Sequence, residues 1–179
     1  MECEQMSKIE EILQSGLKPK EKLTALVEAV TQNKISAKEF IEYFKSASDV
    51  EKGTCADAMK HISKEKPEIL APYIDELIGY INYDAPRVKW GIPEAIGNLS
   101  QRYPREVEKA IPKLLINTKD KSTVIRWCAA YGLTEIAKNN SRTRKELMPL
   151  FESIIEKEDN NGIRNVYVKA IRFIEKEVR

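Results

Sequence analysis

Hydrophobic residues recur along this chain with the spacing of a helix, and one pattern returns at a near-constant interval. Its four copies each begin at a basic residue, and these residues lie 37, 37 and 38 positions apart: Lys52, Lys89, Arg126 and Arg164. Six and seven residues further on, a small residue precedes a large one, as Ala58-Met59, Ala95-Ile96, Gly132-Leu133 and Ala170-Ile171. Positions 3, 6, 7 and 10 after the basic residue share one face of a helix. Each copy is therefore predicted to contain a helix that turns this face to the core and admits a close neighbour at the small residue.

An amphipathic segment precedes each of these helices, so the pattern predicts pairs of helices joined by short polar links. Prolines inside three of the first helices, Pro72, Pro112 and Pro149, remove a backbone donor and are expected to bend them. Residues 7–33 read as one more pair, which lacks the full pattern and would cap the stack. We expect one all-α domain, 1–179, of about ten helices, divided into the cap, 1–34, and four repeats, 35–66, 67–103, 104–141 and 142–179.

Composition supports a helical domain and narrows the function. Charged residues make up 32% of the chain, against 7 Gly and 8 Pro, which favours helices over a turn-rich sheet. The formal net charge of +2 is far below that of a protein that coats nucleic acid. Cys3, Cys55 and Cys128 form no CxxC pair, so we expect neither a disulfide framework nor a zinc site. No stretch resembles a signal peptide or a membrane span, and we expect a cytoplasmic protein without cofactor or metal.

The third copy resembles a HEAT repeat, the unit of the ARM/HEAT-like α-solenoid family. Its sequence, PKLLINTKDKSTVIRWCAAYGLTEIA, has a proline and paired leucines in the first helix, followed by Asp120, Arg126 and a small residue. The copies near Pro67 and Thr143 match more loosely, and the one near Ser36 is degenerate. The resemblance implies a right-handed superhelix of antiparallel helix pairs, with the second helices on the concave side. It indicates architecture more than function, because the family serves many unrelated binding roles.

The resemblance also assigns a role to the basic residue at the head of each second helix. In HEAT proteins this residue commonly bonds an aspartate of an adjacent repeat, and the bonds form a ladder. We expect the structural ladder to consist of Lys52, Lys89, Arg126 and Arg164. Their acids would be the aspartates that stand five or six residues ahead of the last three, Asp84, Asp120 and Asp159. The alternative is a ridge of cations that contacts phosphates.

The face of the second helices opposite the core would line the concave surface of a HEAT stack. It carries Trp90 and Trp127 at equivalent positions, with Glu94 and Tyr131 one helical turn further on and Glu135 after them. Exposed tryptophans are frequent anchors in binding surfaces. We therefore predict that these five residues bind a protein or peptide. The alternative is that each indole packs over the preceding turn, between neighbouring repeats.

A second function is open on the same residues. The HEAT-like DNA alkylpurine glycosylases carry a tryptophan four residues before a catalytic aspartate, and Trp90 and Glu94 loosely resemble that pair. Here glutamate replaces the aspartate, the chain is short and nearly neutral, and Pro93 is expected to disturb the helix that presents Glu94. Nucleic acid is therefore the less favoured partner. We expect a monomer, or a homodimer closed through the concave face.

Other catalytic schemes find little support, and we predict no catalytic residue. His61 is the one histidine, and no motif of a serine or cysteine nucleophile surrounds it. No HExxH, GxxxxGK or GxGxxG string occurs. The densest run of cations opens a first helix on the side away from the concave groove and is expected to be a solvated loop: Arg142, Arg144 and Lys145.

Overall fold

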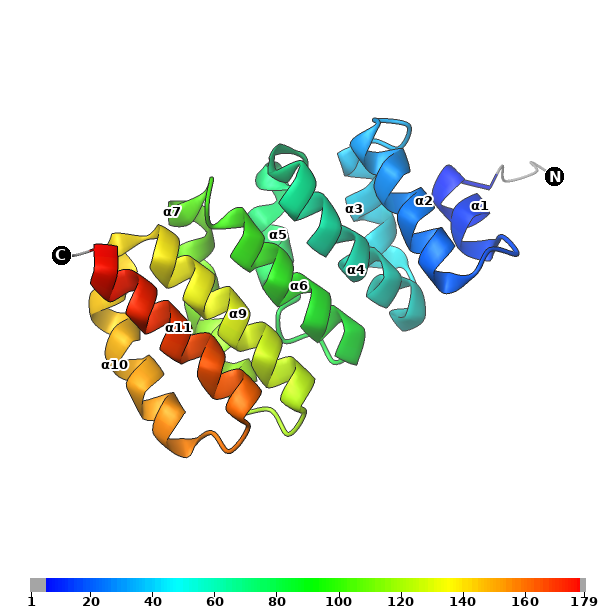
Figure 1. Ribbon diagram of the computed structural model, residues 1–179. Coiled ribbons are helices and arrows are strands. Elements are labelled where there is room, and N and C mark those ends of the chain that lie inside the picture. The colour runs from blue at the N-terminus through cyan, green and yellow to red at the C-terminus, as the bar shows by residue number, and fades with distance from the viewer. Residues whose placement is uncertain (1–5, 178–179) are drawn as a thin grey trace.

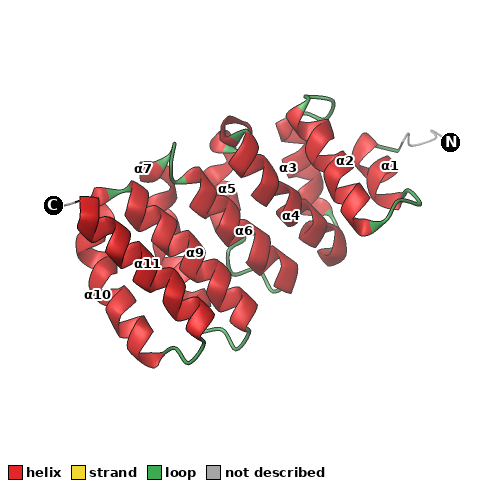
Figure 2. Cartoon of the chain, viewed as in Figure 1, coloured by secondary structure: helices red, strands yellow, loops and turns green. Residues whose placement is uncertain are grey.

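The computed structural model describes residues 6–177, which contain helices and no strand (Figure 2). The all-α class predicted from the sequence is confirmed. The α-helices are α1 (Lys8–Gln14), α2 (Pro19–Thr31), α3 (Ala37–Ser46), α4 (Asp49–Glu65), α5 (Ile74–Gly79), α6 (Pro86–Leu99), α7 (Pro104–Val107), α8 (Ile111–Asn117), α9 (Thr123–Asn139), α10 (Ser141–Lys157) and α11 (Asn161–Glu177). Three short 3-10 helices accompany them, η1 (Pro67–Ile69), η2 (Ala71–Tyr73) and η3 (Glu108–Ala110). Within residues 6–177, no helix is both long and apolar enough to cross a bilayer.

Local sequence signals set the starts of these helices. Ser7, Ser36 and Ser48 each accept a hydrogen bond from the backbone N–H three residues on, at the starts of α1, α3 and α4. Ser122 does the same for α9. Such a serine satisfies one of the backbone donors that the first turn leaves without a partner. In α6 the first turn holds Pro86 instead, whose missing N–H costs nothing at that position.

The helices lie in two layers (Figure 1). In that view α2, α4, α6, α9 and α11 lie side by side toward the viewer, and α3, α5 and α10 lie behind them. Along the front layer, α2 packs on α4, α4 on α6, α6 on α9, and α9 on α11. We call these five the second helices, and α1, α3, α5, α8 and α10 the first helices. Each segment predicted as a pair contributes one second helix, although α10 begins at Ser141, one residue before the expected boundary.

The core follows the predicted stripe. Positions 3, 6, 7 and 10 of the four copies are buried except at Ile171, which is half-buried. The buried members are Cys55, Ala58, Met59, Ile62, Ile92, Ala95, Ile96, Leu99, Ala129, Gly132, Leu133, Ile136, Tyr167, Ala170 and Ile174. The side that faces the core was thus predicted correctly from the period for α4, α6, α9 and α11.

Small residues bring neighbouring second helices close together, as expected. A Cβ atom added to Gly132 would lie 2.9 Å from the carbonyl oxygen of Pro93 in α6. At Gly91, which the repeat pattern did not single out, the approach is closer. There an added Cβ would lie 2.5 Å from both the carbonyl carbon and the oxygen of Ala56 in α4. Backbone packs directly on backbone at these points, so the front layer tolerates no side chain there.

The prolines act differently from one another. Residues 67–79 form η1, η2 and the short α5, with Pro72 at the start of η2, and Pro112 lies in the first turn of α8 after η3. These two first helices are broken into short segments rather than bent, because proline is accommodated best at a helix start. By contrast, α10 runs through Pro149 and α6 runs through Pro93. The helix that presents Glu94 is therefore not interrupted at Pro93.

The basic run at residues 142–145 opens α10, a first helix, as predicted, but it is helical rather than a loop. Arg142 and Lys145 are exposed, whereas Arg144 is half-buried. Arg144 donates hydrogen bonds to the carbonyl oxygens of Ala137 (2.9 Å) and Lys138 (2.7 Å), at the C-terminus of α9, and pairs with Glu177 of α11 (2.7 Å). These carbonyls have no partner within α9, and a cation stabilises that end of a helix. Arg144 thus joins three helices.

Candidate functional site

The predicted site residues lie on α6 and α9, which are neighbours in the front layer. Counted from the basic residue of each copy, they occupy positions 1, 5 and 9. We call the surface formed by positions 1, 5, 9 and 12 of α4, α6, α9 and α11 the second-helix face. The structure shows how much of this face is open and how its side chains are held.

The two tryptophans are in different environments. Trp127 is 38% exposed and stacks on Tyr131 one turn along α9, with ring centroids 5.8 Å apart and an angle of 11° between the planes. Trp90 is half-buried, and among the described residues its buried indole N–H has no hydrogen-bond acceptor. Trp127 therefore has the exposure of an anchor, whereas Trp90 lies closer to the packed alternative. Binding by the five predicted residues stays a prediction.

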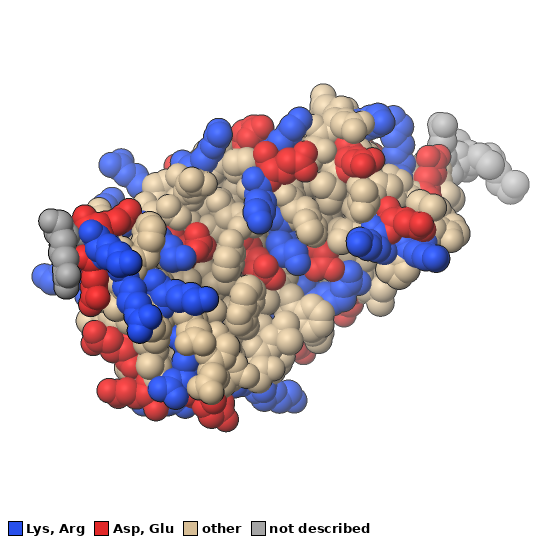
Figure 3. All heavy atoms as spheres, in the orientation of Figure 1, with Lys and Arg blue, Asp and Glu red and all other residues tan. Residues whose placement is uncertain are grey.

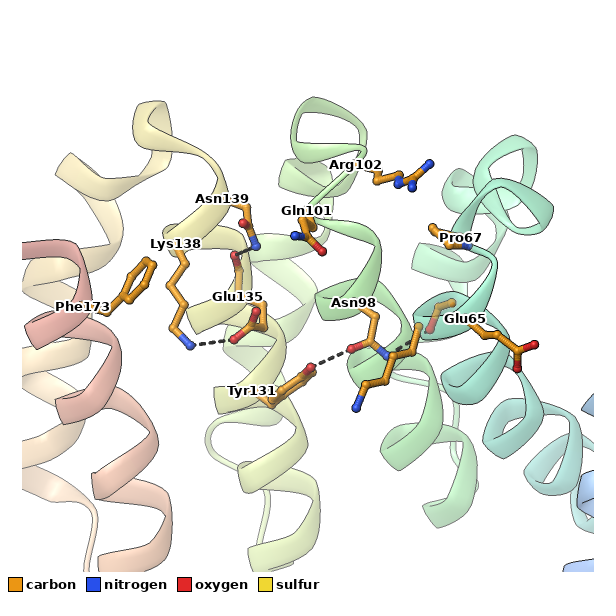
Figure 4. Close-up of a pocket in the computed structure, with 12 residues that line it drawn as sticks. Glu65, Pro67, Asn98, Gln101, Arg102, Tyr131, Glu135, Lys138, Asn139 and Phe173 are labelled. Atoms are coloured by element: carbon orange, nitrogen blue, oxygen red, sulfur yellow. Dashed lines mark hydrogen bonds and ion pairs between the residues drawn. The ribbon is translucent and has the colours of Figure 1, made fainter. Parts of the chain in front are cut away.

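Tyr131 is fixed by a chain of hydrogen bonds that crosses three helices. Its hydroxyl donates to Oδ1 of Asn98 in α6 at 2.6 Å (Figure 4). The amide nitrogen of Asn98 in turn donates to the carbonyl oxygen of Lys60 (3.0 Å) and to Oγ of Ser63 (3.1 Å), both in α4. Burial, aided by the charges of Glu135 and Glu94, raises the pKa of Tyr131 to about 12. The phenol is therefore a neutral donor at physiological pH, and its ring holds the indole of Trp127 in place.

Glu94 is occupied by its neighbours on the face. Its carboxylate accepts a hydrogen bond from the thiol of Cys128 at 3.6 Å and lies 3.9 Å from Nζ of Lys60. Burial, and next the charge of Glu94, raises the pKa of Cys128 well above its usual value, so the thiol stays protonated and can donate. Glu94 therefore links α4, α6 and α9, and it is mostly buried.

A hollow of about 490 Å³ opens beside Tyr131, toward the C-terminal ends of the second helices (Figure 4). Its sides carry Glu135 and Lys138, which form an ion pair at 2.7 Å. The ammonium of Lys138 also lies 5.8 Å from the ring centroid of Phe173, a side chain of α11 that is 46% exposed. The lining combines amides, cations and rings: Ser63, Lys64, Glu65, Pro67, Asn98, Gln101, Arg102, Tyr131, Glu135, Lys138, Asn139 and Phe173.

The repeat positions also identify residues of this hollow that were not among the predicted site residues. Phe173 stands at position 9 of the last copy, equivalent to Asn98 and Glu135. Lys64, Gln101 and Lys138 all stand at position 12. Applying position 9 to the last copy would have found Phe173, and extending the outward positions by one turn would have found Lys138.

The basic residues at the helix heads differ in their partners. Nζ of Lys89 lies 3.6 Å from Asp84 and 3.6 Å from Asp120 of the following pair. Arg126 donates to both carboxylate oxygens of Glu158, at 2.9 and 3.0 Å, and lies 3.5 Å from Asp159. These hydrogen bonds lower the pKa of Glu158. The principal acid for Arg126 is thus the buried Glu158, one residue before the aspartate named from the sequence.

The first and last basic residues make no such pair. Lys52 donates to the carbonyl oxygen of Ala47 and lies 5.7 Å from the ring centroid of Tyr83 in the next pair. Arg164 is exposed, and no carboxylate within residues 6–177 forms an ion pair with it. Of the four basic residues at the helix heads, Lys89 and Arg126 therefore form ion pairs with the following helix pair.

A second, wider hollow of about 1070 Å³ lies between α8 and α10 and was not foreseen. Its walls include Leu115, Ile116, Leu150 and Ile154, and Ile116 is 63% exposed. The charged residues at its base, among them Arg126, are largely those already paired between helix pairs. This hollow belongs to the first-helix side of the molecule.

Comparison of the sequence with models of protein families and with curated proteins finds no match. Within residues 6–177, no group of three or more His, Cys, Asp and Glu side chains is placed to hold a metal ion.

Proposed function

We propose that this chain is a non-catalytic binding module of the HEAT-like type, which recognises an extended segment of a protein or peptide on its second-helix face. The 37- to 38-residue repeat and the layer of second helices support the family and a right-handed superhelix. In that arrangement the second-helix face is the concave one, where a partner can contact several repeats at once.

The observation that carries this proposal is the exposed indole of Trp127 stacked on a hydrogen-bonded Tyr131. A free side chain loses rotamer freedom when a partner binds, and that loss opposes binding. Here the stacking and the bonds through Asn98 have already restricted the two rings. Large aromatic side chains held in this way dominate the energy of protein interfaces. The adjoining hollow also presents the exposed side-chain amide of Gln101, which can bond the backbone of an extended segment.

The geometry supports the glycosylase alternative less well than it supports peptide binding. Such a mechanism needs a carboxylate directed at the sugar of a bound nucleotide. The carboxylate of Glu94 accepts from Cys128 and faces Lys60, and the neighbouring indole of Trp90 is half-buried. The alternative is tested by incubating the protein with DNA that contains N-methylated purines and assaying for abasic sites. We expect none, whereas base release that Glu94→Gln abolishes would establish the enzyme.

The proposal is tested by selecting linear peptides from a displayed random library on the immobilised chain, and by measuring the Kd of the selected peptides. Trp127→Ala should weaken binding by about 2 kcal/mol, which is roughly 30-fold. Ile116→Ala is the matched control, because it also removes an exposed apolar side chain but lies at the other hollow. Selected peptides that depend on Ile116 and ignore Trp127 would overturn the proposal.

A homodimer closed through the same face is the remaining alternative. Sedimentation of the chain and of Trp127→Ala separates the two states. We expect a monomer in both cases, and a dimer that the substitution dissociates would assign the face to self-association.

A further inference from the structure

The carboxylates of the second-helix face are already paired with cations on or beside that face. Asp57, Glu94 and Glu135 have cationic partners at 2.6, 3.9 and 2.7 Å, contributed respectively by Arg87, Lys60 and Lys138. The three carboxylates are also mostly buried. Their negative charge is therefore largely compensated within the protein before any partner arrives.

Five cations on or beside this face have no such match. Lys64 and Arg102 line the hollow, while Lys169, Arg172 and Lys176 extend from α11, and all five are exposed. No carboxylate among residues 6–177 forms an ion pair with any of them. Figure 3 shows cationic side chains projecting from this side of the molecule, gathered most densely over α11 at the left. The hollow itself has one exposed acidic side chain, Glu65, to offset these five positive charges.

We infer that the partner segment is acidic, with carboxylates flanking an aromatic or aliphatic residue; this inference rests on the proposed function. The apolar residue would contact the exposed rings of Trp127 and Phe173, which belong to neighbouring helices. Carboxylates on one side of it would meet Lys64 and Arg102, and those on the other side Lys169 and Arg172. Charge complementarity of this kind raises the association rate and selects the partner, while the rings supply most of the affinity.

The distribution of charge favours an acidic peptide over a nucleic acid. A nucleic acid places a phosphate at every nucleotide, so its charge is continuous along the strand. The unmatched cations lie in two groups, Lys64 and Arg102 at the ends of α4 and α6 and the others on α11, and α9 with its internally paired Glu135 lies between them. A peptide can place neutral residues opposite this interval, and a phosphate backbone cannot.

Fluorescence anisotropy with short labelled peptides tests the inference. The probes are a peptide in which glutamates flank leucine and phenylalanine, a counterpart with glutamine for each glutamate, and single-stranded oligothymidylate. The double variant Lys64→Gln/Arg102→Gln is compared with Lys119→Gln/Lys157→Gln at the other hollow. Both variants change the formal net charge from +2 to 0, so they separate the effect of position from that of total charge.

We expect the acidic probe to bind more tightly than its glutamine counterpart. Its Kd should rise about tenfold in Lys64→Gln/Arg102→Gln and less than about twofold in the control. Raising NaCl from about 50 to about 300 mM should weaken it several-fold, because exposed charges are screened. Equal binding of the two peptides would overturn the acidic preference and leave the proposed function intact. Binding of oligothymidylate alone, reduced by the same double variant, would overturn both. Binding of no probe would overturn the acidic preference, and the library selection then decides the proposed function separately.

Discussion

Replacing Gly91 by alanine adds one methyl group where α6 meets α4. In an isolated helix this change is favourable by about 0.5–1 kcal/mol, because glycine loses more backbone freedom on folding. In this protein the new Cβ would lie 2.5 Å from the carbonyl carbon and oxygen of Ala56. Both atoms belong to backbone inside α4, so relief requires the two helices to move apart. Overpacking of this kind typically costs about 1–3 kcal/mol, and more where the neighbour cannot shift.

We therefore expect Gly91→Ala to lower the free energy of unfolding by about 2 kcal/mol, and Tm by about 4–8 °C for a chain of this length. Urea denaturation followed by circular dichroism measures the change. Gly79→Ala is the matched control, because no atom lies within 4 Å of a Cβ added there, and we expect it to be neutral or slightly stabilising. If Gly91→Ala were as stable as the original chain, the close contact between α4 and α6 would be refuted.

Three further predictions concern the core, the ion pairs and the stack. Tyr167→Phe should stabilise the fold by about 1 kcal/mol, because the buried hydroxyl of Tyr167 has no hydrogen-bond partner among the described residues; a loss of stability on urea denaturation would show that the hydroxyl is bonded. Arg126→Met leaves the carboxylate of Glu158, which is 5% exposed, without its partner, and should destabilise by about 3 kcal/mol at pH 7. Arg126 lowers the pKa of Glu158 in the folded state. The stabilisation from this pair is therefore complete above the unfolded-state pKa of about 4.3, and it is lost as the pH falls through the lower, folded-state pKa of Glu158. The difference between the two proteins should therefore shrink in denaturation series taken toward pH 3, and a difference independent of pH would contradict this role. A chain cut after Asn140 lacks α10 and α11, exposes the side of α9 that packs on them, and should aggregate or lose cooperative unfolding; a melt as sharp as that of the full chain would contradict a stack.

The front layer was predictable because its signal is local and repeated. A small residue followed by a large one, with the helical period around it, identified the core face of four helices, and residues such as Ala95 and Ile136 are fully buried as expected. The sequence predicted the course of the first helices less well, because several of them contain proline. Proline can bend a helix, break it or be accommodated inside it, and the sequence around Pro72 and Pro149 does not distinguish these outcomes. Only the packing of the neighbouring helices does.

The sequence predicted which face of the helices carries the candidate site, but not the exposure or the partners of its side chains. The period placed Trp90 and Trp127 on one face, but their exposure depends on side chains of other helices, and so the two differ. Glu158 and Asp159 are adjacent in sequence, and only the path of the link before α11 decides which one meets Arg126. Arg144 resembles a solvated cation until the C-terminus of α9 is placed beside it.

Hydroxyl-radical footprinting of the chain, with and without a peptide selected on it, tests the central claim most directly. The method reports the solvent exposure of individual side chains, and both faces carry exposed side chains that react. The account predicts that the peptide protects Trp127 and Phe173 on the second-helix face and leaves Ile116 unchanged. Protection of Ile116 with full reactivity at Trp127 would place the binding site at the hollow between α8 and α10, and would contradict the account.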